Sequence, residues 1–354
     1  RNNSNVKLMV GLGRTLLDKV IGFDLADYFK DPGVCLQSQL KWKLFWHNEI
    51  KDDTPIDLVA GIDYAVALEP SLFGVKALFS SEKDPCYGDP IIKQRDDLNH
   101  LQYPDFFQSG LMPLAHENYR KMTDAAGDRL TVAFPGWARG PWSMACILRG
   151  FTELYLDIID SPEFTHELMQ FIVNSRIEFE KERSKFLNLD IKNKDRLWKY
   201  CVYRNLASSE LFEDEVDGTL FSPEAYKEFI LPYEKQLAEF YGGIKYYHSC
   251  GKLTSFLPDL AQIDGIDIIH ISPWTDMKKA MEVFPENVVL QRSLHPIEDV
   301  ITADEKAMED KLKSIIKEAE GRKVEIWADA LYEGSWGTLE KVKKLVKIFR
   351  GLTS

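Results

Sequence analysis

The sequence has few cysteines and no long apolar run. Its five cysteines among 354 residues are odd in number, widely spread and too few for a disulfide framework. No stretch approaches the roughly 18 consecutive apolar residues of a membrane span, and the N-terminal segment lacks the basic, apolar and small-residue succession of a signal peptide. We therefore expect reduced thiols, a cytoplasmic location and no membrane partner.

Positive charge is also scarce, because 44 Lys and Arg face 56 Asp and Glu, for a net charge of −12. Proteins that bind nucleic acids concentrate Lys and Arg on one face. The densest basic run, Lys341 to Lys347, alternates with apolar residues as the solvated side of a final amphipathic helix would. We expect no nucleic-acid partner.

A glycine-rich nucleotide fingerprint is missing as well. Gly11-Leu12-Gly13 is followed by Arg14-Thr15-Leu16, without the third glycine. Repeats and flexible linkers are absent too, which favours one domain over residues 1–354, with residues 1–130 as an N-terminal part that carries extra elements.

Short β-rich runs alternate with helical stretches from about residue 130 onward, which is typical of βα units and a parallel sheet. Helices are expected at Ser161–Leu187, Ala225–Tyr241 and Asp304–Glu320. Strands are expected at Leu130–Phe134, Leu197–Tyr203, Ile244–Tyr247, Ile266–Ile269, Val288–Gln291 and Val324–Ala328. With further strands from the first 130 residues, this pattern predicts an α/β fold, a (β/α)8 TIM-like barrel; an open doubly wound sheet is the alternative.

A His-x-Cys pair, His248 and Cys250, ends one of the predicted strands. Residues two apart on a strand share a face, so the imidazole and the thiol can point at one atom. That combination suits a soft metal such as zinc, although a packed cysteine beside a hydrogen-bonded histidine has the same pattern.

Several blocks together resemble the uroporphyrinogen decarboxylase superfamily, and within it the cobalamin-dependent methyltransferase branch. The resemblance is clearest over residues 131–354. It rests on Gly140-Pro141-Trp142, Leu148-Arg149-Gly150-Phe151, Phe221-Ser222-Pro223-Glu224-Ala225-Tyr226, Leu231-Pro232-Tyr233 and His248-Ser249-Cys250-Gly251.

The resemblance implies that His248 and Cys250 are two of three zinc ligands, the third being a cysteine near the end of the last strand. This sequence has no cysteine after Cys250, so Asp329, or else Glu333, is the expected third ligand. Either carboxylate also has a plainer interpretation, as a helix cap or a solvated loop charge.

A carboxylate in place of a thiolate makes zinc a stronger Lewis acid, which favours demethylation of an O-methyl substrate, such as an aromatic ether, over methylation of a thiol. The chain lacks the Asp-x-His-x-x-Gly run with which corrinoid carriers ligate cobalt. The resemblance therefore implies a separate corrinoid (cobalamin) carrier protein as partner, and it also allows a homodimer.

Two alternatives stay open: a decarboxylase of a tetrapyrrole, and a non-catalytic barrel that binds a tetrapyrrole or corrinoid. The decarboxylases of the superfamily carry an arginine-rich N-terminal motif that holds substrate carboxylates. The run from Met9 to Arg14 does not match this motif, which speaks against decarboxylation.

The remaining candidate residues lie near predicted strand ends. His270 and Glu215 are expected as general acids, with a strand-end hydrogen bond and a solvated charge run as their plainer interpretations. The expected substrate-binding residues are Trp137, Arg139, Trp142, Trp274 and Arg292. Most tryptophans belong to protein cores, so only one or two of these should face a ligand.

Overall fold

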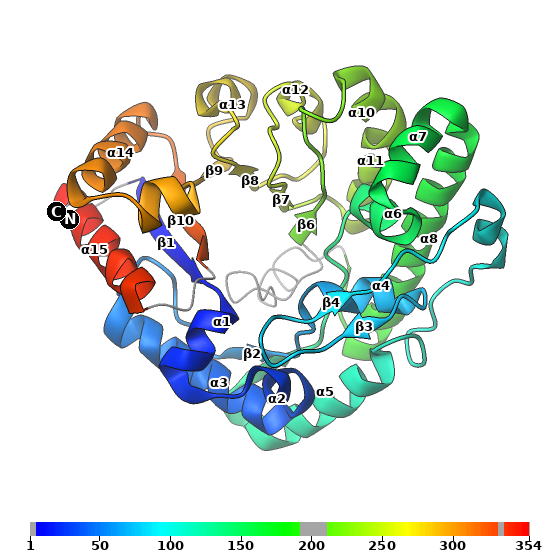
Figure 1. Cartoon of the computed structure of the whole chain (residues 1–354), viewed down its shortest axis with the longest axis horizontal. Coiled ribbons are helices and arrows are strands. Elements are labelled where there is room, and N and C mark those ends of the chain that lie inside the picture. The colour runs from blue at the N-terminus through cyan, green and yellow to red at the C-terminus, as the bar shows by residue number, and fades with distance from the viewer. Residues whose placement is uncertain (1–4, 192–210, 332–335, 354) are drawn as a thin grey trace.

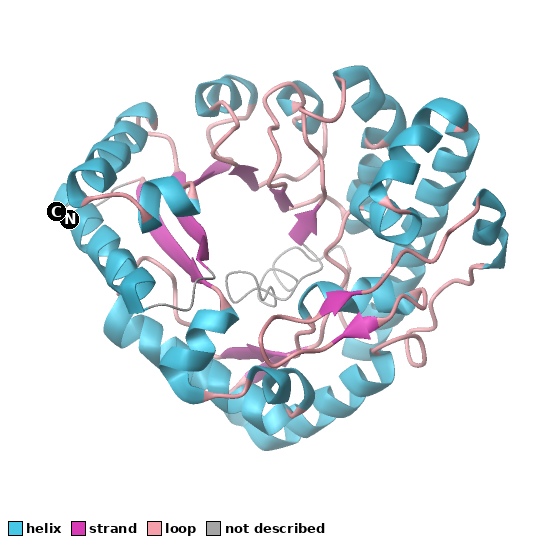
Figure 2. Cartoon of the chain, viewed as in Figure 1, coloured by secondary structure: helices cyan, strands magenta, loops and turns pink. Residues whose placement is uncertain are grey.

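The computed structural model describes residues 5–191, 211–331 and 336–353. Its strands form a ring with helices outside it (Figures 1 and 2). The parallel strands are β1 (Val6–Leu12), β2 (Val59–Gly61), β5 (Thr131–Ala133), β6 (Leu211–Glu213), β7 (Tyr246–His248), β8 (Ile268–Ile271), β9 (Val289–Ser293) and β10 (Val324–Leu331). A short antiparallel pair, β3 (Ala77–Leu78) and β4 (Cys86–Tyr87), stands apart from the ring.

Strand pairing closes this ring almost completely. Six strands run in the order β1-β10-β9-β8-β7-β6, and β2 pairs with β5, every pairing in these two sheets being parallel. A parallel bridge between Arg139 and Glu213 joins the segment after β5 to β6. The predicted (β/α)8 barrel is thus confirmed, and the open doubly wound sheet is not formed.

Two aspartates close the remaining gap between β1 and β2. The Asp52 carboxylate accepts a hydrogen bond of 2.8 Å from the backbone NH of Val10, and that of Asp53 accepts one of 2.9 Å from Leu8. The backbone NH of Asp53 in turn donates to the Leu8 carbonyl, at 2.9 Å. These side chains satisfy backbone groups of β1 that a neighbouring strand would otherwise pair.

Helices cover the outside of the barrel. They are α1 (Arg14–Leu17), α2 (Leu25–Lys30), α3 (Pro32–Phe45), α4 (Leu68–Leu72), α5 (Met112–Ala126), α6 (Pro141–Arg149), α7 (Phe151–Asp160), α8 (Pro162–Leu187), α10 (Pro223–Phe229), α11 (Leu231–Tyr241), α12 (Leu257–Leu260), α13 (Met277–Val283), α14 (Glu305–Glu318) and α15 (Trp336–Thr353). None of the helices in the described ranges is both long enough and apolar enough to cross a membrane.

Most of the predicted elements are confirmed with shifts of a few residues at their ends. The helix expected at Ala225–Tyr241 is wrong as one element, because it breaks at Ile230 into α10 and α11. Pro232 lies in the first turn of α11 and lacks the NH that a continuous helix would need there. The strand expected at Leu197–Tyr203 lies outside the described residues, and β6 was not predicted.

The main hydrophobic core lies between the strands and the helices. Leu8, Val10 and Leu12 of β1 join it, whereas Met9 between them is buried outside this cluster. This alternation follows from the two faces of a strand. The opposite face of each strand points into the barrel, and there the residues toward the C-terminal ends are largely polar.

A buried carboxyl group lies in the outer layer, on α11. Glu234 is fully buried and accepts hydrogen bonds from the hydroxyl groups of Tyr226 and Tyr247, the latter at 2.7 Å. Burial raises its pKa from 4.5 to about 8, and the nearby Asp214 carboxylate adds to the shift. Glu234 therefore carries a proton in the folded protein at neutral pH.

We expect Glu234 to contribute a loss of stability as pH rises from 4.5 toward 8, which the buried neutral His248 and His270 oppose below about pH 6.5. The unfolded chain releases the Glu234 proton above about pH 4.5, whereas the folded chain keeps it up to about pH 8. The loss is at most about 1.4 kcal/mol per pH unit. Denaturant unfolding across this pH range measures it. Glu234→Gln, which mimics the protonated acid, should remove this contribution from the slope of stability against pH, whereas Glu239→Gln at an exposed position of the same helix should leave the slope unchanged. Equal slopes for the two variants would contradict the assignment.

Candidate active site at the barrel mouth

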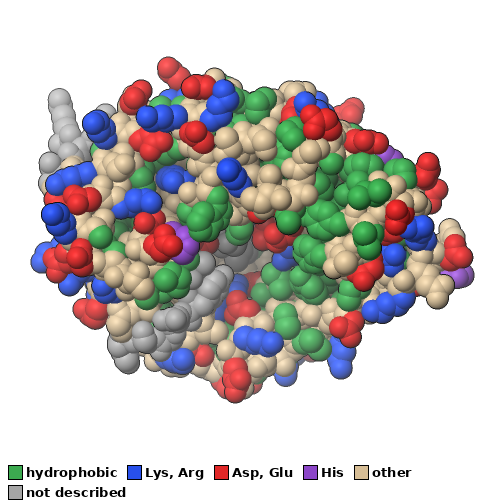
Figure 3. Space-filling view, turned by 45° about the horizontal axis from the view of Figure 1, so that its top comes forward, with side chains coloured by type: hydrophobic (Ala, Val, Ile, Leu, Met, Phe, Trp, Pro, Cys, Tyr) green, Lys and Arg blue, Asp and Glu red, His purple; other side chains and the backbone are tan. Residues whose placement is uncertain are grey.

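A row of polar residues crosses neighbouring strands near their C-terminal ends. Arg139 pairs with Glu213 across a bridge, and Glu213 is in register with His248. On the next strands His270 is in register with Gln291. Catalytic groups of (β/α)8 barrels gather at this end, so the row is the candidate active site. Acidic side chains are seen near the centre of the face drawn in Figure 3.

The His-x-Cys pair converges as the sequence predicts. His248 Nε2 lies 3.4 Å from the sulfur of Cys250. The Tyr246 hydroxyl donates its proton to Gln291 Oε1, and it lies 3.2 Å from His248 Nδ1. Because that proton is already committed, the hydrogen-bond network assigns the NH to Nδ1 and leaves the Nε2 lone pair facing the thiol. This is the tautomer that a metal ligand at Nε2 requires.

Burial governs the charge of both members of the pair. It lowers the pKa of His248 to about 4, and the Arg139 cation lowers it further. The pKa of Cys250 is raised to about 12, first by burial of the sulfur and then by the carboxylates of Glu213 and Glu215, although the residue as a whole is exposed. At neutral pH the protein without a bound cation therefore holds a neutral imidazole beside a protonated thiol.

Asp329 and Glu333, the two residues predicted as the third zinc ligand, differ in what the structure shows of them. Asp329 is half-buried near the end of β10, and its carboxylate takes the space that a side chain at Gly11 would need, since a Cβ there would lie 2.3 Å from Oδ1. Glu333 lies outside the described residues. Within residues 5–191, 211–331 and 336–353, no three His, Cys, Asp or Glu side chains are grouped so that they could hold a metal ion. Two donors fit zinc, and the choice of a third stays a prediction.

His270 lies directly against His248. The two imidazole rings stack with centroids 4.1 Å apart and 19° between their planes. His270 Nδ1 lies 2.7 Å from the carbonyl oxygen of Ser249, to which it donates, and Nε2 accepts from the Ser293 hydroxyl at 2.7 Å. With both nitrogens engaged and its pKa lowered well below 6.5 by burial, His270 is a positioning residue for the Ser249 loop rather than the general acid we expected.

Two neighbouring carboxylates, Asp214 and Glu215, follow β6. Asp214 is buried and accepts from the backbone NH groups of Ser143, at 2.6 Å, and Trp142, at 3.3 Å, in the first turn of α6. Burial raises its pKa to about 6 despite these bonds. Glu215, the predicted general acid, is exposed as a whole residue, but desolvation of its carboxyl group raises its pKa as well.

Arg139 is buried, and no described residue forms a hydrogen bond or ion pair with its side chain. It is 7% exposed, its Nε has no hydrogen bond, and no ion pair within 4.0 Å joins it to a described carboxylate. Glu213, Glu69 and Glu215 are near enough to raise its pKa. Arg139 lies beside the start of α6, and its role in substrate binding stays a prediction.

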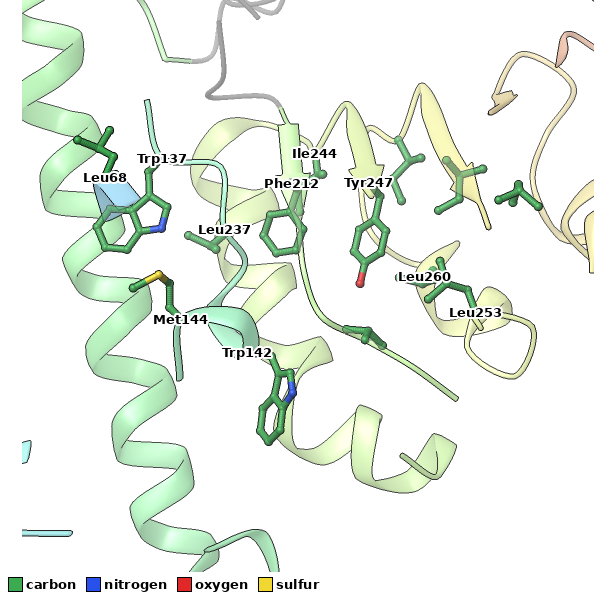
Figure 4. Close-up of a cluster of buried hydrophobic side chains, with 14 of the residues drawn as sticks. Leu68, Trp137, Trp142, Met144, Phe212, Leu237, Ile244, Tyr247, Leu253 and Leu260 are labelled. Carbon is green, nitrogen blue, oxygen red and sulfur yellow. The ribbon is translucent and has the colours of Figure 1, made fainter. Parts of the chain in front are cut away.

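The predicted tryptophans divide between core and surface. Trp137 and Trp142 are 0% exposed and belong to the buried hydrophobic cluster drawn in Figure 4. The ring of Trp137 packs against Phe73 and Phe179, and that of Trp142 against Tyr155 and Phe221. Their burial corrects the expectation that they line a substrate pocket. Trp274 is 55% exposed and meets the ring of His295 edge-on, with centroids 5.1 Å apart. Trp274 alone of the three remains available to a ligand.

Arg292 is corrected for a different reason. Its guanidinium donates to the backbone carbonyls of Ser272, of Thr275 at 3.3 Å and of Pro273 at 3.4 Å. Arg292 also alternates with Gln291 on β9, so it belongs to the opposite face of that strand. These bonds hold the loop after β8 and leave the guanidinium committed to the protein.

Sequence reasoning did not identify Tyr246 as part of the site, and it gave Gln291, Glu213 and Asp214 no definite role. Tyr246 could have been found, because it shares the face of His248 two residues away. Gln291 meets Tyr246 only because β7 and β9 both face the barrel interior, and no local pattern reports that contact. Glu213 and Asp214 belong to the acidic run from which Glu215 was chosen as the general acid, and without β6 the sequence could not tell which of these carboxylates enters the site.

Comparisons with known proteins agree with this fold. The family model described as "Uroporphyrinogen decarboxylase (URO-D)" matches residues 54–184 and 207–327. Uroporphyrinogen decarboxylase from Synechococcus sp. (strain CC9605) is 22% identical over 255 residues, and that from Parasynechococcus marenigrum (strain WH8102) is 23% identical over 253 residues. Each alignment covers 68% of this chain and 63% of the relative, so the chain spans less than two thirds of their length.

A solved structure is similar over almost the whole chain. A methyltransferase from Methanosarcina mazei superposes with a TM-score of 0.68 and 16% identity, covering 98% of this chain and 93% of that one. At this identity the likeness shows the shared fold. Because the family model covers well over half of the sequence, the chain belongs to the uroporphyrinogen decarboxylase family of enzymes.

Proposed function

We propose that this protein is a methyltransferase that moves a methyl group between a small O-methyl substrate, such as an aromatic ether, and a corrinoid held by a separate carrier protein. The observation that carries the proposal is the pair at the barrel mouth, in which the Nε2 lone pair of His248 faces the sulfur of Cys250 at 3.4 Å. A histidine nitrogen and a cysteine sulfur held together in this way are typical zinc ligands.

His248, Cys250 and a carboxylate, Asp329 or Glu333, would hold the zinc ion. Bound there, zinc would supply a Lewis acid for the ether oxygen of the substrate. The Tyr246 hydroxyl orients His248 by accepting from its Nδ1, as second partners of metal-bound histidines commonly do. The high pKa of Cys250 means that the thiol must lose its proton when the metal binds.

Glu215 is the group that we propose to protonate the leaving oxygen of the substrate. Its raised pKa favours the protonated carboxyl, the form that a general acid needs. His270 would keep the Ser249 carbonyl in place, and through it the loop that carries Cys250. In this proposal His270 positions the loop that carries Cys250, and Glu215 supplies one proton to the leaving oxygen of the substrate.

The carrier protein is proposed to dock at the same end of the barrel. The loops after β6, β8 and β9 each present an exposed apolar side chain there: Leu220 (60% exposed), Trp274 (55%) and Ile297 (45%). Apolar side chains surrounded by polar ones are common at sites of transient protein association. This surface supports a partner that approaches the mouth.

Decarboxylation of a tetrapyrrole is the second candidate, because the similar curated proteins carry that name. A porphyrinogen with many carboxylates needs several free cationic donors. Arg14 already forms ion pairs with Asp63 and Asp84, and Arg292 is bonded to backbone carbonyls. These pairings favour methyl transfer over decarboxylation.

One experiment compares the two activities directly. The purified protein is supplied with zinc, a reduced corrinoid and an aromatic methyl ether, and the methylated corrinoid is followed by its absorbance; in a parallel reaction it is supplied with uroporphyrinogen. We expect methyl transfer in the first reaction and no release of carbon dioxide in the second. Decarboxylation without methyl transfer would overturn the proposal.

A further inference from the structure

Two buried nitrogen atoms in the barrel have no acceptor. Arg139 Nε and Gln291 Nε2 are both without a hydrogen-bond partner, in side chains that are 7% and 0% exposed. Burying an unsatisfied donor costs about 1–3 kcal/mol, and more when the group is charged. Such a cost is common at sites where a ligand supplies the missing acceptor.

Both side chains belong to the interior of the barrel. Gln291 on β9 reaches Tyr246 on β7 although β8 lies between these strands, and this contact is made inside the ring. Arg139 lies beside β6, next to Glu213, and its charge acts on both His248 and Cys250. The two donors therefore lie near the His-x-Cys pair, one on β9 and the other beside β6.

Among the described arginines near the barrel mouth, Arg139 is the one whose side chain has no hydrogen-bond or ion-pair partner. Arg14 forms ion pairs with two aspartates, and Arg292 donates to three carbonyls, whereas no hydrogen bond or ion pair joins the guanidinium of Arg139 to another described residue. Guanidinium groups bind carboxylates with two parallel hydrogen bonds. One such group matches a substrate with one carboxylate and not a substrate with many.

We propose that Arg139 binds an anionic oxygen of the substrate, so that the methyl donor is an O-methyl compound carrying a carboxylate. Gln291 Nε2 would donate to a further oxygen of the same ligand. The inference rests on the proposed function for the methyl group, but the recognition of the carboxylate stands on the unpaired donors alone. The nearby carboxylates of the half-buried Glu213 and the exposed Glu215 would disfavour a second anionic group on the ligand.

Calorimetric titration of the full chain with defined probes tests this inference. The probes are benzoate, para-methoxybenzoate and the neutral para-methoxybenzamide. We expect both carboxylates to bind more tightly than the amide, and Arg139→Gln to weaken the carboxylates roughly 10- to 100-fold while leaving the amide unchanged. Arg139→Lys should recover part of the affinity, because it keeps the charge but loses the paired donors.

Arg120→Gln is the matched control, since Arg120 is exposed on α5 and pairs only with the exposed Asp124. It should bind all probes as the native protein does, and circular dichroism of each variant checks folding. Equal affinity of the native protein for acid and amide, no binding of any carboxylate, or unchanged carboxylate binding in Arg139→Gln would each overturn the inference. Because benzoate has no methyl group to transfer, these results are independent of whether methyl transfer occurs.

Discussion

Purified His248→Ala and Cys250→Ser proteins are expected to lose zinc that the native protein retains. Each change removes one of two donors that meet at 3.4 Å, and the remaining donor cannot hold the ion at the same strength. Loss of a supporting partner alone commonly weakens metal binding about 10- to 100-fold. Removal of a direct ligand should therefore reduce the zinc affinity by more than roughly 100-fold.

Tyr246→Phe should give an intermediate result. It keeps both donors but removes the hydroxyl that holds Nδ1 of His248, so the ring loses its fixed orientation and tautomer. Competition with a chromophoric chelator measures all of these affinities. His47→Ala is the control, because His47 is exposed and lies about 200 residues before His248 and Cys250 in the sequence. This variant should bind zinc with the same affinity as the native protein. A native protein prepared without chelator that contains no zinc would refute the metal site.

Gly140→Ala is expected to destabilise the protein strongly, although Gly140 has an ordinary backbone conformation, with φ of −67°. A Cβ at this position would lie 2.2 Å from Cγ and Oδ2 of Asp214, a side chain that is 1% exposed. Overpacking a core position commonly costs about 1–3 kcal/mol, and moving Asp214 also breaks its bonds to the amides of Ser143 and Trp142. The total should reach about 3 kcal/mol or more.

Urea unfolding of the variant measures this loss, and Gly351→Ala is the matched control. Gly351 lies in α15, and an added Cβ would meet nothing within 4 Å. That substitution should leave stability unchanged or raise it by up to about 1 kcal/mol through helix propensity. If Gly140→Ala unfolds at the same urea concentration as the native protein, the close approach of Asp214 is not required for folding.

Local pattern predicted those elements whose signals lie within a few residues. The expected strands at Leu130–Phe134 and Val324–Ala328 correspond to β5 and β10, and Pro162 marks the first turn of α8. By contrast, β6 has only three residues and carries too little periodicity to be recognised. The break between α10 and α11 depends on one proline in a segment that otherwise reads as a continuous helix.

The candidate site also contains residues that could be predicted from local spacing and residues that could not. His248 and Cys250 could be paired from the sequence because a strand brings residues two apart to one face. The roles expected for Trp137 and Arg292 needed knowledge of which face of the barrel each one occupies, and both are committed to packing or to backbone carbonyls. A tryptophan and an arginine are residue types that binding sites often use, but in this fold both side chains already contact the protein and not a ligand site.

By itself, the sequence determined the parallel α/β class of this protein, because the strand and helix periods are local, and it determined the His248-x-Cys250 pair, because two-residue spacing is local as well. Only the tertiary structure decided that Tyr246 and Gln291 set the tautomer of His248, and that Arg139 alone among the arginines of the described mouth is left unpaired. Those contacts join strands far apart in the chain, and they arise when the barrel closes and brings its inward-facing side chains together.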